Sequence, residues 1–311
     1  MGRARIPARS RRSRSMWNPR RSCELALVVA VVCSAACTAP PRLELRLGFA
    51  EDGFASPEWR AAVVEHTGSE PTWELHPPSD AEAAWLELMR AHRDAWEARI
   101  DELCVPFEGV QPPRTLTLVV GNQHGEDGFG LGEDVIYFDL SALARNYGAA
   151  SEPANAARLE RFFDHETTHV LHGRWERMHP QPVGTPLERA LWAMAREGLG
   201  NLRSLSETWV GPGGELTPLA RETLAELEPI LVERLEKLAR ARAEEESALI
   251  KGLSWGPFRK KWGALPVALW LAEESRGDDR ALRPFVSAGS AGVLALARRH
   301  LAPDLAQRLP R

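Results

Sequence analysis

Two hydrophobic patterns divide the chain into a strand-rich first part and a longer helical part. Leucines alternate with charged residues over 43–47, and apolar β-branched runs occupy 115–120 and 135–140. Both patterns predict strands. The glycine-rich stretch 121–132 lies between the last two runs, and we expect it to be a turn joining them.

The later part of the chain shows apolar residues mostly at helical spacing. The Glu/Arg-rich residues 233–246 are interpreted as the solvated face of one long helix. Strands followed by helices predict an α+β fold, with a small N-terminal β-sheet followed by a mostly helical core. No clear linker interrupts residues 42–311, which are therefore expected to form a single domain. The predicted helices are 80–103, 155–173, 186–206, 216–250, 262–275 and one near 290–300.

The N-terminus has the pattern of an export signal. Residues 25–36 read LALVVAVVCSAA, an apolar run too short to span a membrane, and Arg20 and Arg21 precede it. We expect a signal peptide over 1–36, and Met16 is an alternative start of the chain, because a conventional signal begins there. A chain with this signal leaves the cytoplasm.

The end of the apolar run resembles the lipobox of bacterial lipoproteins. Small residues, Ser34-Ala-Ala, precede Cys37, although the family prefers leucine at the position of Ser34. The resemblance implies a lipidated Cys37, a tether over 37–41 and a location in the bacterial cell envelope, anchored to a membrane by lipid. The alternative is an ordinary secretory signal and a secreted protein. With Cys37 lipidated, Cys104 would lack an intramolecular disulfide partner, and we expect it to be buried as a small apolar side chain.

The charge of the mature chain restricts its partners. Residues 1–36 hold eight arginines and one glutamate, so the remainder has 31 basic and 42 acidic residues and a net charge of −11. An acidic body repels phosphate backbones, which argues against a nucleic-acid partner. Oligomeric state does not follow from the sequence.

The sharpest motif is Phe-Phe-Asp-His-Glu-Thr-Thr-His at 162–169. His165 and His169 are four residues apart, so they share one face of a helix and can bind one Zn²⁺ ion. Glu166 follows the first histidine and can act as a general base toward a zinc-bound water. This is the HExxH pattern of metallopeptidases.

A third metal ligand is needed beyond the two histidines. Glu197, in an apolar segment 28 residues after His169, is the preferred candidate. His172 is a weaker alternative, because three ligands on one straight helix fit tetrahedral zinc poorly. The metzincin pattern fails, since it needs glycine and histidine where the chain has His172 and Trp175.

With HExxH and the step Glu197-Gly-Leu, the chain resembles the gluzincin metallopeptidases, and among them bacterial zinc proteases of the DUF2268 and peptidase-MA type. The resemblance covers roughly residues 115–275. It implies a zincin-like catalytic core, zinc held by His165, His169 and Glu197, a peptide or protein substrate, and a cleft lined by the strand at 135–140. Two departures are Arg196, where an uncharged residue is usual, and Gly200, where alanine is usual.

The same resemblance suggests an outer partner for a zinc histidine. Many gluzincins place an aspartate four residues after the ligand glutamate. Here that position holds Asn201, whose amide oxygen can still accept an imidazole N–H.

The residue that would stabilise the developing oxyanion stays open among four candidates. Tyr137 is considered because it lies in the strand expected along the cleft, and the others are His172, His179 and Arg196. Two other functions also remain open. One is a non-catalytic envelope lipoprotein that binds partners and has a structural or vestigial metal site. The other is a helical protein in which HExxH occurs by chance.

Overall fold

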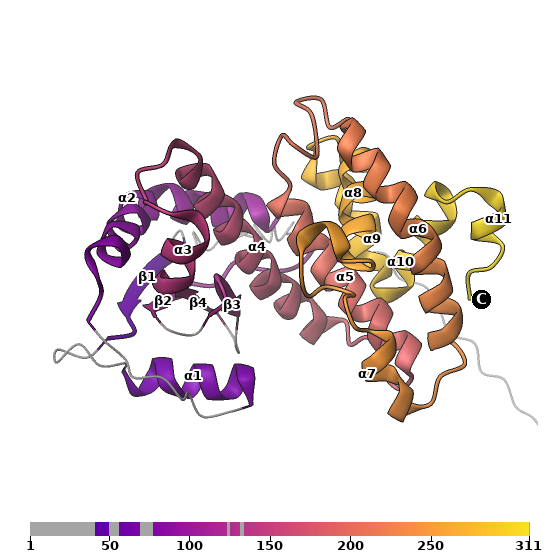
Figure 1. The fold of residues 1–311 in the computed structure, drawn as a ribbon, viewed down its shortest axis with the longest axis horizontal. Helices are drawn as coiled ribbons and strands as arrows, with labels where there is room; N and C mark the ends of the chain where they lie inside the picture. Colours follow the sequence, from indigo (N-terminus) through magenta and orange to yellow (C-terminus); the bar gives the residue numbers. More distant parts are fainter. Residues whose placement is uncertain (1–40, 50–55, 69–76, 123–124, 131–133, 311) are drawn as a thin grey trace, which may run out of the picture. The chain divides into compact units, whose positions relative to one another are not determined.

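A mixed sheet of four strands forms the first part of the fold (Figure 1). The computed structural model describes residues 41–49, 56–68, 77–122, 125–130 and 134–310. Strands β1 (Arg42–Leu47), β2 (Thr115–Gly121) and β4 (Val135–Asp139) run parallel in the order β1-β2-β4. The short strand β3 (Gly128–Gly130) pairs antiparallel with β4 at the edge.

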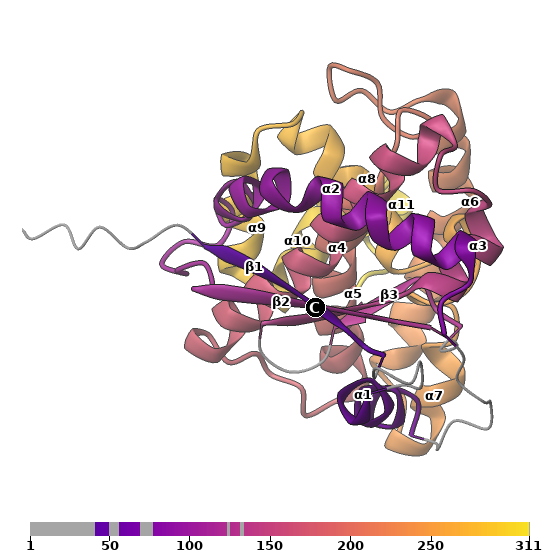
Figure 2. The ribbon, with the colours of Figure 1, turned by 90° about the vertical axis from the view of Figure 1, so that its left-hand side faces the viewer.

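The two faces of the sheet are buried by different helices. Leu118 and Phe138 point to the main core, which they share with α2 (Asp80–Leu103). Their neighbours along the strands point to the opposite face, because side chains alternate along a strand. On that face Val119 and Tyr137 pack with Trp59 of α1 (Pro57–Thr67). Figure 2 shows α2 and α1 on opposite sides of the sheet.

An aromatic stack and an ion pair help to fix helix α4 (Pro153–Met178) against α2. The rings of Trp96 and Phe163 stack with centroids 4.6 Å apart and planes 3° from parallel. Arg99 Nη2 lies 3.0 Å from Asp164 Oδ2. These contacts involve the two residues just before His165, so they fix which face of α4 turns away from α2.

Helix α5 (Pro186–Ser204) lies between α4 and α8 (Ala264–Ser275). Its first turn is set by a capping box between Thr185 and Glu188. A β-carbon at Gly198 would lie only 2.3 Å from Val267 Cγ1, so glycine lets α5 and α8 approach closely. The other helices are α3 (Leu140–Tyr147), α6 (Pro218–Leu238), α7 (Glu246–Leu249), α9 (Arg283–Ala288), α10 (Ser290–His300) and α11 (Pro303–Ala306).

The predicted α+β fold is confirmed: a small four-stranded sheet near the N-terminus precedes a mostly helical chain. The described residues belong to one compact unit, Ala39–Arg311. The expected signal peptide (1–36), Cys37 and all but the last residue of the expected tether (37–41) lie outside the described residues. In the ranges that the structure covers, no helix is long and apolar enough to cross a membrane.

Some predicted elements were wrong. The glycine-rich stretch is not only a turn, because Gly128–Gly130 forms β3. The strand expected to reach residue 140 ends at Asp139, whose carboxylate caps α3 by accepting the N–H groups of Ser141 and Ala142. The helix expected to reach residue 250 ends at Leu238. Residues 239–248 contain no large apolar side chain, so a longer helix would have had no face to bury.

Four helices and one cysteine also differ from expectation. Helices α1, α3, α9 and α11 were not predicted from the pattern. Cys104 is half-buried rather than fully buried, and its thiol donates to the Val110 carbonyl at 3.5 Å. Burial raises the pKa of this thiol to about 11, so it stays protonated near neutral pH.

Candidate metal centre

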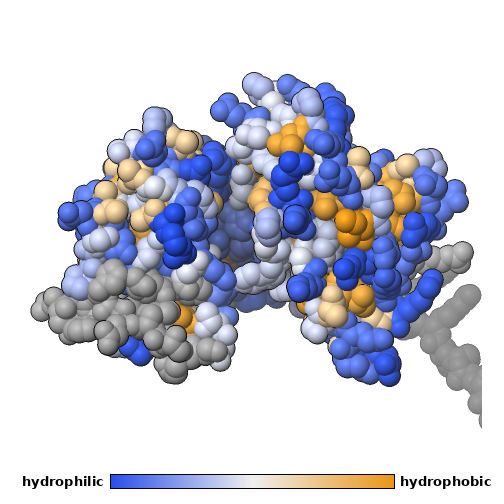
Figure 3. Space-filling model, viewed as in Figure 1, coloured by the Kyte–Doolittle hydropathy of each residue, from blue (hydrophilic) through white to orange (hydrophobic). Residues whose placement is uncertain are grey.

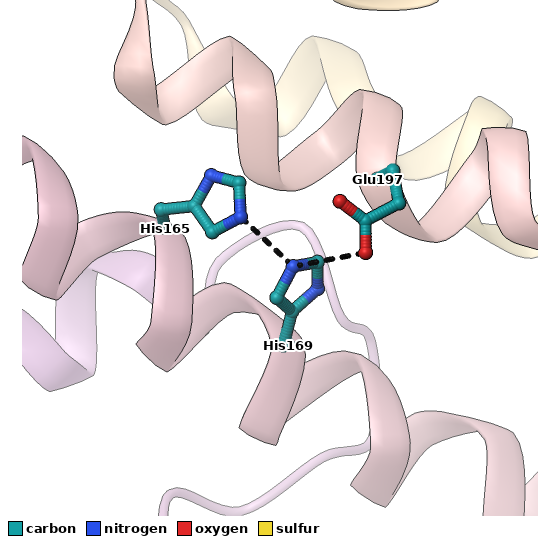
Figure 4. A group of neighbouring side chains, drawn as sticks. All are labelled: His165, His169 and Glu197. Atoms are coloured by element: carbon teal, nitrogen blue, oxygen red, sulfur yellow. Dashed lines mark hydrogen bonds and ion pairs between the residues drawn. The ribbon is translucent and has the colours of Figure 1, made fainter. Parts of the chain in front are cut away.

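Three side chains predicted as metal ligands lie together. His165 and His169 come from α4, and Glu197 comes from α5 (Figure 4). Their ligand atoms all lie within 4.8 Å of one another. The Nε2 atoms of the two histidines are 3.0 Å apart, and His169 Nε2 is 3.5 Å from Glu197 Oε1.

These distances fit a zinc ion. Ligand atoms about 2.0–2.1 Å from a tetrahedral zinc lie about 3.3 Å from one another, and the two observed distances lie on either side of that value. Two imidazoles and one carboxylate are also the donor set of several catalytic zinc sites. The residues present therefore fit a zinc ion in both chemistry and spacing.

Burial keeps both histidines neutral. It lowers the pKa of His165 to about 3, with nearby Lys261 acting in the same direction. It also lowers the pKa of His169 well below the usual value, with His165 as the next cause. A neutral imidazole has a free lone pair on one ring nitrogen, which is the form that binds a metal.

Helix α5 also orients the imidazole rings. Ser204 Oγ lies 2.9 Å from His165 Nδ1, which holds the ring with Nε2 toward His169. Gly200 lies directly against both rings: a β-carbon there would be 2.8 Å from His169 Cε1 and 3.0 Å from His165 Cε1. Glycine at position 200, where the gluzincin pattern has alanine, is therefore required because both imidazole rings lie against this part of α5.

Glu166 lies beside this group without belonging to it. Its Oε1 is 4.0 Å from His165 Nε2, and a β-carbon at Gly130 of β3 would be 3.7 Å from its Oε2. Burial, followed by repulsion from Glu197, raises the pKa of Glu166 to about 8. The nearby cations Arg196 and Lys261 oppose that rise.

The three candidate ligands and Glu166 all line one cavity of about 800 Å³. Figure 3 shows a deep, largely hydrophilic hollow in this face of the molecule. The cavity wall also includes β3, which packs against α4 and whose three residues all line the cavity. The resemblance implied that the strand at 135–140 lines the cleft. In the structure Phe138 of that strand lines the cavity, and the strand beside Glu166, the expected base, is β3.

Asn201 lies in the cavity wall but does not hold a zinc histidine. Its amide Nδ2 donates to the Glu197 carbonyl at 2.8 Å, and its Oδ1 accepts from Lys261 Nζ at 3.3 Å. The hydrogen-bond partner of His165 is instead Ser204, one helical turn further along α5. His169 Nδ1 has no hydrogen-bond partner within the part of the chain that the structure describes.

The structure separates the four candidates for oxyanion stabilisation. Tyr137 is 7% exposed and packs with Trp59 and Phe129 on the face of the sheet that α1 covers. Tyr137 itself does not line the cavity. His172 of α4 is buried near Phe107, and His179, the residue after α4, stacks on Trp175, so neither lines the cavity. Among the four, Arg196 alone lines the cavity.

Sequence reasoning missed Lys261 and Ser204. Lys261 precedes α8, lines the cavity and is partly buried, and this burial lowers its pKa despite the attraction of Glu197 and Glu166. Neither residue belongs to a motif: Ser204 reaches the site because α5 packs on α4, and Lys261 reaches it because the segment before α8 packs on α5. Comparisons of the chain with family models, with curated proteins and with solved structures found no match.

Proposed function

We propose that this chain is a zinc-dependent metallopeptidase of gluzincin type. The proposal rests on one observation: two neutral imidazoles and a carboxylate converge on one point in the wall of a cavity, beside a fourth residue, Glu166, that can act as a base. Catalytic zinc sites commonly have three protein ligands and one open position. A structural site is usually closed by four protein ligands, so a group of three among the residues that the structure describes favours catalysis over the alternative of a purely structural metal.

The chain's own residues provide the remaining groups for hydrolysis. His165, His169 and Glu197 would hold zinc, which when bound polarises a carbonyl group and makes a water molecule more acidic. Glu166 would accept a proton from the attacking water and then donate it to the leaving nitrogen. Lys261 and Arg196 line the same cavity and can offset the negative charge that develops on the carbonyl oxygen.

Strand β3 gives the cavity a place for an extended peptide. It is the last strand of the sheet order and pairs with β4 on one side, while its residues line the cavity. An extended peptide can add to such an edge through main-chain hydrogen bonds, which recognise a peptide without requiring one sequence. This arrangement supports a peptide as the substrate.

The test begins with metal content. Protein purified without chelators should contain about one zinc per chain, and Glu197→Ala should lose most of its zinc affinity while His172→Ala loses little. His172 is the matched control because it lies on the same helix as the two histidine ligands. Loss of zinc from His172→Ala alone would require a centre built on three histidines.

The second part of the test concerns the base. Glu166→Gln should keep its zinc and lose roughly 10²- to 10⁴-fold in peptide hydrolysis, because the water loses its proton acceptor. Unchanged hydrolysis would remove Glu166 from the mechanism. Zinc binding without any hydrolysis of a diverse peptide mixture by the wild type would favour the non-catalytic alternative.

A further inference from the structure

Two arginines continue the line of metal-ligand side chains along α4. Arg161 lies four residues before His165, and Arg158 lies three residues before Arg161, so they share the helix face that carries both histidines. The helical rise places their Cα atoms about 6 Å and about 10 Å from that of His165 along the axis. Both arginines line the same cavity.

Neither arginine has an acidic partner within the described ranges. The Arg158 guanidinium lies over the Tyr147 ring, 4.5 Å from its centroid, and donates to Asn155 Oδ1. Arg161 makes no hydrogen bond or ion pair to any residue that the structure describes. The nearby carboxylate of Asp127 is already bound by the Tyr147 hydroxyl and the Asn146 amide.

Two adjacent guanidinium groups that no carboxylate of the described residues contacts are an unfavourable arrangement. Burial, followed by the proximity of Arg158, lowers the pKa of Arg161, and the attraction of Glu160 and Glu207 opposes this without cancelling it. A ligand carboxylate between the two guanidinium groups would relieve the repulsion, and the planar guanidinium is suited to bind a carboxylate through two parallel hydrogen bonds. The arginines therefore point to a negatively charged group on the substrate.

The direction of β3 indicates which end of a peptide would meet them. Asp127, just before β3, contacts Tyr147, on which Arg158 lies. Gly130, at the other end of β3, lies beside Glu166. A peptide paired antiparallel with β3, the more stable pairing, would run from Glu166 toward the arginines. Its C-terminal end would therefore lie beside Arg158 and Arg161.

We propose that Arg158 and Arg161 form a subsite for the C-terminal carboxylate of a peptide substrate. An extended chain advances about 3.3 Å per residue, so the carboxylate would lie two to three residues beyond the hydrolysed bond. The enzyme would release short fragments from C-termini. This inference rests on the proposed function, because it places the subsite relative to the metal centre.

Binding to zinc-loaded protein tests the subsite without requiring turnover. The probes are three malonyl hydroxamates, in which the hydroxamate takes the metal and a dipeptide extends away from it: Ala-Ala with a free carboxylate, Ala-Ala amide, and Ala-Glu amide. Titration calorimetry should show the free carboxylate binding roughly tenfold or more tighter than its amide, as expected for charge-assisted hydrogen bonds.

The arginine variants decide whether this preference comes from the subsite. Arg161→Gln should bring the affinities of the acid and the amide to within about threefold, and Arg161→Lys should keep part of the preference, since it keeps the charge without the planar fork. Arg177→Gln is the matched control, because Arg177 is exposed on the same helix outside the cavity wall, and it should leave the preference unchanged.

Each other result has a distinct meaning. If the acid and the amide bind equally well to wild type, the subsite is overturned and the metal centre stands. If no hydroxamate binds, the metal centre itself is overturned, and the subsite with it. If Ala-Glu amide binds as tightly as the free acid and depends on Arg161, the subsite recognises an acidic side chain, which overturns its assignment to the C-terminus.

Discussion

At the scale of single residues, Gly200 shows how a metal site can depend on an absent side chain. Helix α5 must approach α4 closely enough for Glu197 to reach the histidines, and Gly200 is one turn further along the same face. Any β-carbon at position 200 would press on His165 and His169. The ligand rings therefore rest against main chain, which fixes their positions without a hydrogen bond to His169 Nδ1.

Gly200→Ala should displace both imidazole rings and weaken zinc binding. We expect a loss of roughly 10- to 100-fold, the size seen when groups that orient metal ligands are removed. Gly173→Ala on α4 is the control, because a β-carbon there would meet nothing within 4 Å. Zinc titrations of both variants measure the difference, and wild-type affinity in Gly200→Ala would show that the rings do not depend on contact with α5.

At the scale of elements, α4 buries three histidines in succession. His165 and His169 face the cavity, while His172 is 3% exposed on another side of the helix. Burial, helped by Arg196, lowers the pKa of His172 to about 3, although Glu176 Oε1 lies 3.8 Å from its Nε2. Nδ1 of His172 has no hydrogen-bond partner among the described residues, which adds to the cost of protonating the buried ring.

The depressed pKa of His172 predicts a loss of stability in acid. Below pH 6.5 the unfolded chain takes up a proton at this residue and the folded chain does not, so stability is complete above pH 6.5 and falls as pH drops toward 3. The slope from this residue is about 1.4 kcal/mol per pH unit. Urea unfolding with a chelator present, at several pH values, measures it.

The matched variant for this measurement is His172→Leu, which keeps an apolar side chain of similar size but cannot titrate. Burial is the first cause of the lowered pKa of both His165 and His169 and is kept in the variant, so the difference between the two curves reports mainly His172. That difference should shift in favour of the variant by about 1.4 kcal/mol for each pH unit below 6. Curves that stay parallel from pH 7 to pH 4 would contradict the assignment of a buried, neutral His172.

At the scale of the whole molecule, the chain combines a basic N-terminal segment, residues 1–36, with an acidic remainder. The lipobox-like sequence ends at Cys37, directly after the basic segment. We propose that the mature protein is attached to a membrane of the bacterial envelope through lipid on Cys37. Several acyl chains anchor firmly, whereas a single chain would bind only marginally.

Cys37→Ser should release the protein from the membrane fraction or leave its leader uncleaved, because the residue that carries the lipid is gone. Cys33→Ser is the control and should fractionate like wild type, since bulky Val32 before it makes Cys33 a poor lipidation site. Mass spectrometry of the mature N-terminus, with membrane fractionation, measures both. A soluble wild type with an unmodified N-terminus would overturn the proposed anchor.

The sequence by itself determined the features that depend on local spacing. Two histidines four residues apart on a helix must share a face, and the apolar pattern around Glu197 predicted the second helix that brings the carboxylate near them. Strands at 43–47 and 115–120 were equally visible, because period-two alternation and β-branched runs are local signals. The α+β order followed from the order of these segments.

Tertiary structure decided which side chains from distant segments reach the site. Tyr137 and Phe138 are adjacent in sequence, yet opposite faces of the sheet bury them, and of the two only Phe138 lines the cavity. Ser204 and Lys261 enter the site through the packing of α5 with α4 and α8. Three residues of β3 are too few to show a period, so their strand exists only through pairing with β4.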